Sequence, residues 1–518
     1  MRHIFTHSIL SVGTLIAFPL QAQKMADERK AEKPNIVLIY ADDIGWGDLS
    51  CYGAHRVTTP HVDALAENGV RFLNAHSAAA TSTPSRYGLL TGEYPWRRNG
   101  TGIARGDAGL IIKPHRYNIA KLMKEAGYTT GAVGKWHLGM GEETGTQDWN
   151  GRIAPGPHEM GFDYSYLMAA TGDRTPCVYL ENQQVANLDP RDPISVSYTK
   201  NFDGEPTGKD NPELLTKLKP SPNHGHDQSI INGISRIGYM KGGKAALWQD
   251  ETIADSITSR AVRFITQNKD KSFFLYFGTN DIHVPRYPHE RFRGKTDMGH
   301  RGDAIVQFDW AVSEVIRALK EAGIYENTLI ILSSDNGPVI DDGYADEAVE
   351  RLMDHKPWGP YRGGKYSMFE AGTRVPFIVH WPAVVRPGVS EALVSQIDLL
   401  ATLAALTGVT LEEEKLSDSK NQLSAWLGED NEGKEYLIGA GNSLMIQTKE
   451  WKYIEPNNGG AYQKLTDIET GNSPKEQLYH LLYDRSEYDN VAGKNPLMVR
   501  FLKQILDEEK SKGVRMDL

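Results

Sequence analysis

The segment Asn35-Ile36-Val37-Leu38-Ile39-Tyr40 is an apolar run rich in β-branched side chains. Such a run is typical of a strand that is buried on both faces of a sheet. It ends in Ala41-Asp42-Asp43, and glycines at positions 45 and 47 allow the chain to turn. The stretch therefore predicts a buried strand with acidic side chains at its carboxyl end.

Similar strands alternate with helices along the chain. Pro60 suits the first turn of a helix, and Gly127 suits the position after the last turn of another. The alternation predicts an α/β fold in which a large, mostly parallel sheet is sandwiched between helices. Strands are expected at 128–133, 273–278, 328–332 and 374–380, and helices at 60–68, 119–126, 304–322 and 397–406.

The first residues do not follow this pattern. In residues 1–22 a short basic start precedes an apolar run of about 12 residues, which is too short to span a bilayer. This pattern predicts a signal peptide that is cleaved after Ala22, followed by a polar leader over 23–33. The mature protein is therefore expected to be secreted or periplasmic, with no membrane insertion.

The rest of the chain divides into an α/β domain over 34–430 and a C-terminal α+β subdomain over 431–518. Within the first, residues 141–250 form a loop-rich insertion with much Gly, Pro, Asn and Asp, which is typical of binding loops. In the second, short apolar runs between turn signals predict a small antiparallel sheet and a terminal helix over 496–509.

The composition excludes several classes of protein. The 518 residues include 57 Lys and Arg against 67 Asp and Glu, a formal charge of −10, whereas a nucleic-acid partner requires a basic face. An anionic substrate held by a few local cations is compatible with this charge. The two cysteines, Cys51 and Cys177, are too few for a disulfide scaffold or a four-cysteine zinc site, and the sequence leaves open whether they pair.

Two acidic clusters, Asp42-Asp43 and Asp335-Asn336, follow buried strands at equivalent places. Ligands of an open parallel sheet bind beyond the carboxyl ends of its strands. Three carboxylates that meet there repel one another unless a cation neutralises them, and oxygen donors suit a hard cation, Ca²⁺ first and Mg²⁺ second. The alternative interpretation is that these are ordinary capping and turn residues.

Further polar side chains are expected on the same rim. Ser82 opens a predicted helix, and the N-terminus of a helix favours an anion. Taken singly, each of these side chains is more often an ordinary capping, surface or core residue. Together with a metal they fit a tetrahedral oxyanion ester. The group comprises Ser82, Arg86, Lys135, His137, His283 and Lys365.

The order and spelling of these motifs resemble the type I sulfatases of the alkaline-phosphatase superfamily. The first family signature, Cys or Ser, any residue, Pro-Ser-Arg and then Leu-Thr-Gly, is present between Ser82 and Gly92. The second is present as Gly127-Tyr128-Thr129-Thr130 with Gly134-Lys135-Trp136-His137. The resemblance covers residues 34–492. The remaining motifs, in the family's order, are Asp42-Asp43, His283-x-Pro285, Asp335-Asn336-Gly337 and Arg362-Gly363-Gly364-Lys365.

The resemblance implies a modified residue and a metal. Ser82 is the position that the family converts to formylglycine (3-oxoalanine), whose hydrated aldehyde is the nucleophile. A serine rather than a cysteine there implies maturation by an anaerobic sulfatase-maturating enzyme. By the same resemblance, the Ca²⁺ ligands are Asp42, Asp43, Asp335 and Asn336.

The resemblance also implies a division of labour among the remaining catalytic side chains. Lys135 and Lys365 neutralise the sulfate oxygens, and Arg86 stabilises the ionised diol. His283 protonates the departing sugar oxygen. His137 then takes a proton from the second hydroxyl, which expels sulfate and regenerates the aldehyde.

Two alternatives stay open at this point. One is a phosphatase or phosphodiesterase of the same superfamily, although such enzymes usually hold two metals, and the amide at Asn336 favours one. The other is a glycan-binding protein with a dead catalytic site, which would follow if Ser82 were never modified.

The substrate is predicted from two short sequence segments. Residues 45–49 and 51–53 are similar to those of sulfatases that act on galactose or N-acetylgalactosamine 6-sulfate. We therefore expect an exo-acting sulfatase for a sulfated carbohydrate, with a 6-O-sulfated galacto-configured sugar as substrate. Asp173 and Arg174 in the insertion are expected to bind sugar hydroxyls, the alternative being a surface ion pair. His355 is a further candidate for substrate binding.

Overall fold

In the computed structural model, which describes residues 33–513 except 413–414 and 416–417, the first apolar run is strand β1 (Asn35–Ala41). All of its residues are buried, as predicted for a strand that is covered on both faces. The predicted signal peptide and nearly all of the leader lie outside the described residues. Among the helices of the described part, none is long and apolar enough to cross a bilayer.

β1 lies inside a ten-stranded mixed sheet. Its centre is parallel, in the order β13, β1, β12, β4 and β5, which confirms the predicted arrangement. Toward the edges β14 and β6 reverse, and the two-residue turn Asn182-Gln183, with both φ positive, joins β6 and β7 as an antiparallel hairpin. Across the sheet the strands are β15 (Gly388–Ser390), β2 (Val70–Phe72), β14 (Phe377–His380), β13 (Thr328–Ser334), β1, β12 (Phe273–Gly278), β4 (Thr129–Lys135), β5 (Tyr164–Met168), β6 (Tyr179–Glu181) and β7 (Gln184–Val185).

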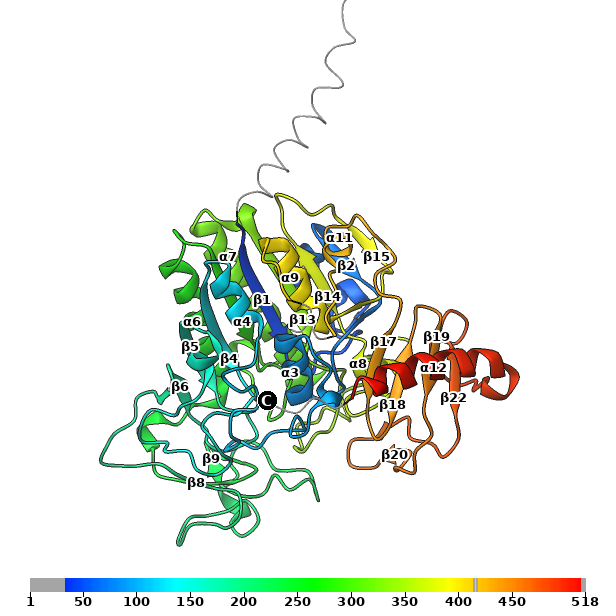
Figure 1. Ribbon diagram of the computed structural model, residues 1–518. Helices are drawn as coiled ribbons and strands as arrows, with labels where there is room; N and C mark the ends of the chain where they lie inside the picture. The colour runs from blue at the N-terminus through cyan, green and yellow to red at the C-terminus, as the bar shows by residue number, and fades with distance from the viewer. Residues whose placement is uncertain (1–32, 413–414, 416–417, 514–518) are drawn as a thin grey trace, which may run out of the picture.

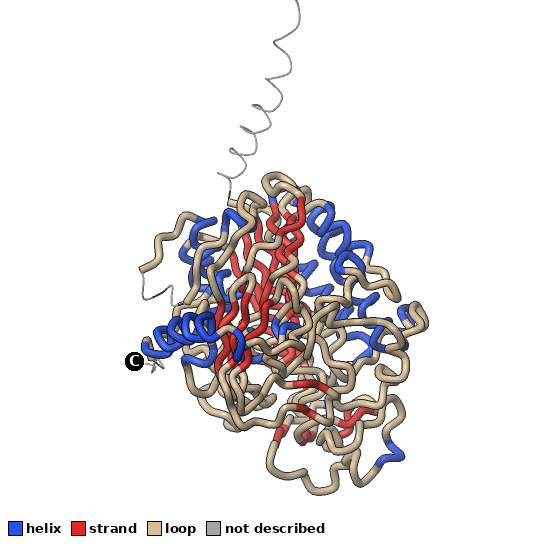
Figure 2. Tube along the Cα trace, turned by 90° about the vertical axis from the view of Figure 1, so that its right-hand side faces the viewer, coloured by secondary structure: helices blue, strands red, loops and turns tan. Residues whose placement is uncertain are grey.

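Helices cover both faces of this sheet (Figures 1 and 2). One layer holds α2, α6 and α7, in which α7 packs against both α2 and α6, and the other holds α3, α4 and α9. The sheet is therefore buried between two helical layers, and its strand ends are the places where polar groups reach a surface. The bounds are α2 (Pro60–Glu67), α3 (Ser82–Thr91), α4 (Ile119–Glu125), α6 (Ile253–Gln267), α7 (Gly299–Glu321) and α9 (Leu399–Thr407).

A smaller antiparallel sheet forms in the C-terminal region, orange and red in Figure 1. Helix α12 (Pro496–Ser511) packs Val499, Leu502 and Leu506 against one face of it. This confirms the predicted small sheet with a terminal helix, whereas the boundary at residue 430 stays a prediction. The strands are β17 (Leu437–Ala440), β18 (Leu444–Gln447), β19 (Trp451–Ile454) and β22 (Gln477–His480).

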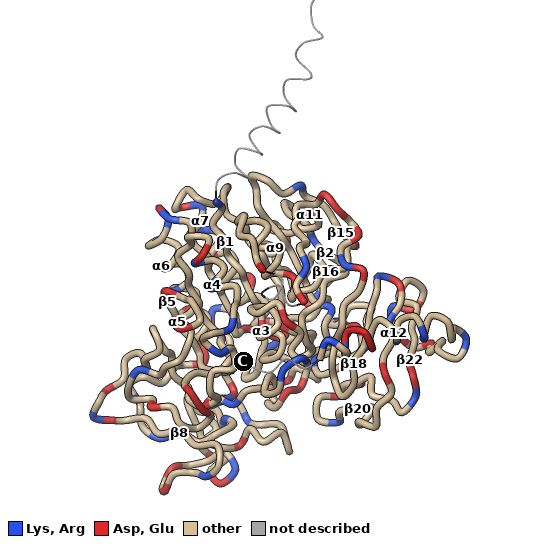
Figure 3. Tube along the Cα trace, in the orientation of Figure 1, with Lys and Arg blue, Asp and Glu red and all other residues tan. Residues whose placement is uncertain are grey.

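Buried charges join the small sheet to the large domain. Lys452 on β19 lies 3.0 Å from Glu370 Oε1 and 3.1 Å from Glu487 Oε1, and all three side chains are inaccessible to solvent. Elsewhere basic and acidic residues are interspersed along the chain (Figure 3). Within the predicted insertion over 141–250, β5, β6 and β7 belong to the large sheet, and the rest, cyan to green at the lower left of Figure 1, has mostly loops with short strands.

Candidate active site

The two acidic clusters meet because β1 and β13 are parallel neighbours. Their register aligns the last residues of both strands, so Asp42 and Asp335 leave the sheet side by side. The amide nitrogen of Asp43 donates to Asp335 Oδ1 at 3.2 Å, and Asn336 Nδ2 donates to Asp43 Oδ1 at 2.7 Å. All four residues are buried. The structure thus brings the four predicted metal ligands together at one edge of the sheet.

The donor set of this edge suits a hard cation. Asp42 Oδ2 is buried and has no hydrogen-bond partner among the described residues. Burial raises the pKa of Asp42, and repulsion by Asp335 and Asp43 raises it further, although Lys135 opposes them. A cation among these oxygens would offset both the burial and the repulsion. One atom each from Asp42, Asp43 and His283 also lie within 4.8 Å of one another.

Ser82 is the first residue of α3 and lies against this edge. Lys135, the last residue of β4, donates from Nζ to Ser82 Oγ at 2.8 Å and to Asp42 Oδ1 at 2.6 Å. Ser82 Oγ in turn donates to Asn336 Oδ1 at 3.4 Å. A reactive group at position 82 therefore touches both a cation and a predicted metal ligand.

Arg86 lies one turn after Ser82 on α3 and is fully buried. Its Nη2 donates to Asp335 Oδ2 at 2.7 Å, and its Nη1 donates to the hydroxyl of Tyr276, a contact that the sequence did not predict. Burial alone would raise the pKa of Asp335, but Lys135 and Arg86 outweigh burial and hold that pKa well below its usual range. Asp335 is therefore ionised.

Lys365 is the second buried ammonium group of the site. Its Nζ donates to Asp43 Oδ2 at 2.9 Å and to Asp342 Oδ2 at 2.7 Å. Burial lowers the pKa of Lys365, but the two carboxylates outweigh burial and raise it well above its usual value, so Lys365 is a cation. Asp342 was missed in the sequence because it lies in a loop where no periodic pattern marks it.

His137 has one free ring nitrogen. Its Nε2 lies 3.0 Å from the carbonyl oxygen of Ala104, which can only accept, so Nε2 carries the proton. Burial lowers the pKa of His137, and the Lys135 cation lowers it further, so the ring is neutral. Nδ1 is then a buried lone pair without a partner in the described part of the chain. This geometry suits a base.

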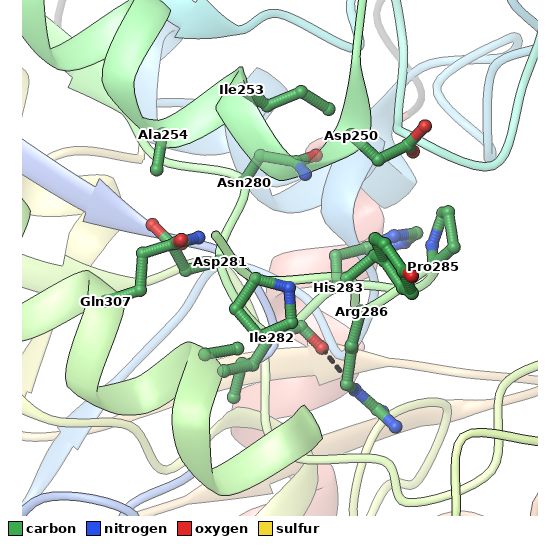
Figure 4. A pocket seen from close by; sticks show the side chains of 13 residues that line it. Asp250, Ile253, Ala254, Asn280, Asp281, Ile282, His283, Pro285, Arg286 and Gln307 are labelled. Atoms are coloured by element: carbon green, nitrogen blue, oxygen red, sulfur yellow. Dashed lines mark hydrogen bonds between the residues drawn. The ribbon is translucent and has the colours of Figure 1, made fainter. Parts of the chain in front are cut away.

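His283 follows β12 and is held firmly by its surroundings. Its Nδ1 donates to the carbonyl oxygen of the next residue at 2.7 Å, which leaves Nε2 for a substrate. Arg286 Nε donates to the carbonyl oxygen of Ile282 at 2.8 Å (Figure 4). Behind this segment, Gln307 Nε2 donates to Asp281 Oδ1 at 2.7 Å beside a cavity of about 20 Å³, which is room for about one water.

Strained backbone also marks this site. Non-glycine residues with positive φ cost of order 1–3 kcal/mol each and cluster at functional sites, where the surrounding structure holds them. Here such residues include a predicted metal ligand, a predicted base and the neighbours of two other candidates. Their φ angles are 61° for Asp43, 57° for His137, 65° for Ile282 and 73° for Tyr366.

The site opens into a pocket of about 230 Å³. Asp173 and Arg174 line it together with Ser82 and the two histidines, so the structure brings this predicted pair to the reaction groups. Arg174 Nη1 donates to Asp173 Oδ1 at 3.0 Å, and His226 Nε2 lies 3.0 Å from Asp173 Oδ2. His226 was missed because it lies in the loop insertion. The C-terminal hairpin, formed by β20 (Tyr462–Gln463) and β21 (Ile468–Glu469), adds Gln463, Leu465 and Thr466 to the pocket wall.

His355 is not brought to this pocket. Its Nε2 lies 2.8 Å from Asp48 Oδ1, which also accepts from Arg301 Nη1 at 2.7 Å. It lines a separate cavity of about 490 Å³ together with Trp46. The buried carboxylate of Asp48 therefore holds His355 at this second cavity, and its role in substrate binding stays a prediction.

Comparisons with known proteins agree with the motifs. The sulfatase family model matches residues 34–409. The N-acetylgalactosamine-6-O-sulfatase of Bacteroides thetaiotaomicron is 53% identical over 486 residues, which are 93% of this chain and 94% of that protein. Human arylsulfatase A is 30% identical over 496 residues, which are 92% of this chain and 87% of that protein.

A solved structure gives the same result. It comes from work on the metabolism of multiple glycosaminoglycans by Bacteroides thetaiotaomicron. It superimposes with a TM-score of 0.90 at 53% sequence identity, and the match covers 92% of this chain and 99% of that chain. The fold, the motifs and these similarities agree. The chain belongs to the sulfatase family and is a sulfuric ester hydrolase.

Proposed function

We propose that the chain is an exo-acting glycan sulfatase that removes a 6-O-sulfate from galactose or N-acetylgalactosamine. The observation that carries this proposal is the pocket in which Ser82, the histidines and the Asp173–Arg174 pair lie together. Its volume of about 230 Å³ is below the roughly 300–1,000 Å³ of pockets for drug-sized ligands, so it suits one terminal sugar. The N-acetylgalactosamine-6-O-sulfatase named above supports the same substrate.

Ser82 is the proposed formylglycine precursor, and Ca²⁺ is the proposed metal, since sulfatases generally use both. The hydrated aldehyde supplies one hydroxyl for attack on sulfur and a second for release, and Ca²⁺ supplies neutralising charge. The ion would be held by Asp42, Asp43, Asp335 and Asn336, whose oxygens are buried and close together. A serine at this position also implies a transient complex with the anaerobic sulfatase-maturating enzyme.

The chain's own cations are proposed to bind the sulfate. Lys135 is already 2.8 Å from Ser82 Oγ, so its ammonium group lies beside the reacting atoms. Lys365 brings a second positive charge into the same pocket. Arg86 stabilises negative charge at position 82 from within α3.

The two histidines are proposed to move protons at different atoms. His137 Nδ1, the unpartnered lone pair, accepts a proton from the hydroxyl at position 82, which drives sulfate release. Nδ1 holds the single proton of the neutral ring, so His283 takes up a second proton at Nε2 when the ester binds and then donates that proton to the departing sugar oxygen. Burial and the cations Lys365 and Lys135 lower the pKa of His283, and the negative sulfate ester opposes those cations when it binds.

Asp173 and Arg174 are proposed to bind hydroxyls of the sugar. Both side chains line the pocket, and His226 and Arg174 hold the Asp173 carboxylate from two sides. Arg174 offers its remaining N–H groups to one sugar oxygen while Asp173 accepts from another. The predicted signal peptide over 1–22 places this activity in the periplasm or outside the cell.

A panel of sulfated monosaccharides tests the proposal. Matured enzyme should release sulfate from the 6-sulfates of galactose and N-acetylgalactosamine, with the 6-sulfate of N-acetylglucosamine and the 4-sulfate of N-acetylgalactosamine as matched controls. We expect kcat/KM for the controls to be lower by about 10²-fold or more, because buried polar groups would be left unpaired. Equal rates on the gluco-configured sugar, or activity on phosphate monoesters alone, would overturn the proposal.

A further inference from the structure

A second hollow adjoins the pocket that holds Ser82. It has a volume of about 600 Å³, and Ile103, whose side chain is half exposed, lines both hollows. Ala104 lines the second hollow, and its carbonyl oxygen lies 3.0 Å from Nε2 of His137, which lines the first. The two hollows therefore meet at residues 103–104.

The wall of the second hollow is already formed. Residues 108–111 hydrogen-bond through their backbone to residues 138–141, for example from the Leu110 nitrogen to the Gly141 oxygen at 2.9 Å. The second segment directly follows His137, so the hollow and the proposed base are built on the same stretch of chain. A ligand that enters the hollow therefore meets preorganised groups, which lowers the entropic cost of binding.

The lining of the second hollow suits an uncharged sugar ring. Its side chains include two basic residues, Arg105 and Lys113, and two acidic residues, Glu142 and Glu143. Arg105 is also paired with Asp107 at 2.8 Å. Because basic and acidic groups are nearly equal in number there, we expect shape and hydroxyl contacts rather than net charge to decide what binds.

We propose that the second hollow binds the sugar residue that is linked to the sulfated one. This inference rests on the proposed function and deepens it. The first pocket suits one sugar, so the rest of a glycan must leave it, and the exit at Ile103 leads into a preformed hollow of sufficient size. The other exit, past Leu465 of the C-terminal hairpin, is the competing outcome.

Gly102 provides a clean test. A Cβ added there meets nothing within 4 Å, and the φ of Gly102 is outside the left-handed region, so Gly102→Trp fills the hollow without straining the backbone. Gly493→Trp is the matched control, because Gly493 has the same free space and lies near α12. Each variant is assayed on a 6-sulfated monosaccharide and on a disaccharide that carries the same sulfated sugar at its non-reducing end.

We expect the wild type and Gly493→Trp to prefer the disaccharide, and Gly102→Trp to lose about 10-fold of that preference, mainly through KM. Activity of Gly102→Trp on the monosaccharide shows that it folds, and Gly102→Ala should lose less. An unaltered preference in Gly102→Trp would overturn the inference while the proposed function stands. If Leu465→Trp removes the preference for the disaccharide and Gly102→Trp does not, the inference is likewise overturned while the proposed function stands. If the wild-type enzyme desulfates neither the monosaccharide nor the disaccharide, the proposed function is contradicted, and this inference is contradicted with it.

Discussion

The proposed reaction groups and the proposed specificity groups of this sulfatase lie on different kinds of backbone. Asp335, Asp42, His283 and Lys135 follow or end the four adjacent strands β13, β1, β12 and β4. Asp173 and Arg174, which are proposed to select the sugar, lie instead on the 141–250 insertion. Strand register fixes the first set, whereas loop packing fixes the second. The comparison teaches that this fold can keep its chemistry while its substrate changes.

The loops are not loosely held, however. Arg236 is fully buried in the insertion and donates from Nη2 to Asp250 Oδ2 at 2.7 Å. Its Nη1 donates to the carbonyl oxygen of Gly172 at 2.7 Å, directly before Asp173. The buried Arg236–Asp250 ion pair therefore fixes the backbone next to Asp173, just as the pairing of β1 with β13 fixes the position of Asp335.

The largest loss of activity is expected for a substitution at the carboxyl ends of the strands. Asp43→Ala removes a proposed metal ligand and one partner of Lys365, so turnover should fall by about 10³-fold or more. Bound calcium, measured by elemental analysis, should fall with it, and Ca²⁺ should restore the activity of chelated wild-type enzyme. Full turnover in metal-free buffer would contradict the metal site.

His283→Ala should separate substrates by their leaving groups. A sugar alkoxide needs the proton that His283 is proposed to donate, whereas 4-nitrophenolate leaves readily without it. We therefore expect a loss of about 10²–10⁴-fold on the sulfated sugar and a much smaller loss on 4-nitrophenyl sulfate. Steady-state kinetics on both esters checks this, and equal losses would assign the acid elsewhere.

His137→Ala is the matched control at the other imidazole. Because its proposed task is to release sulfate from the enzyme, this variant should accumulate a sulfate adduct at position 82 with either ester. Intact-protein mass spectrometry would show the added sulfate. Absence of the adduct with both esters would mean that the two roles are assigned wrongly.

A smaller effect is expected on the loop side. Asp173→Asn keeps the shape but weakens acceptance from a sugar hydroxyl, so KM for the sulfated sugar should rise by about 10- to 100-fold. On 4-nitrophenyl sulfate, which has no sugar hydroxyls, the change should stay below about 3-fold. Similar losses of kcat/KM on both esters would place Asp173 among the reaction groups and contradict the division between strand-end and loop residues.

The smallest effect on activity is expected at His355, which the structure places in the separate cavity. His355→Ala should change turnover by less than about 2-fold. It should lower the free energy of unfolding by about 1–3 kcal/mol, because the buried Asp48 loses a hydrogen-bond partner. Denaturant unfolding together with kinetics would check both, and a large rise in KM would restore His355 as a substrate-binding residue.

The sequence predicted the residues at the carboxyl ends of the strands better than the loop residues that line the pocket. Asp42 and Asp335 directly follow strands that contain long apolar runs, and the parallel pairing of those strands brings them together. No such pattern marks Asp342 or His226, because loops far apart in the chain meet only through tertiary packing. His355 shows a further limit of motif reasoning, since a polar residue near a motif can be held by another buried charge such as Asp48 and line a different cavity.

The chemical state of residue 82 decides whether the enzyme uses a formylglycine nucleophile. Protein produced with the anaerobic maturating enzyme should give a peptide lighter by about 2 Da at Ser82, because the hydroxyl has become an aldehyde. Sulfatase activity should appear in that preparation and be missing from protein produced without the maturating enzyme. Fully active protein whose Ser82 peptide retains the unmodified mass would contradict the account.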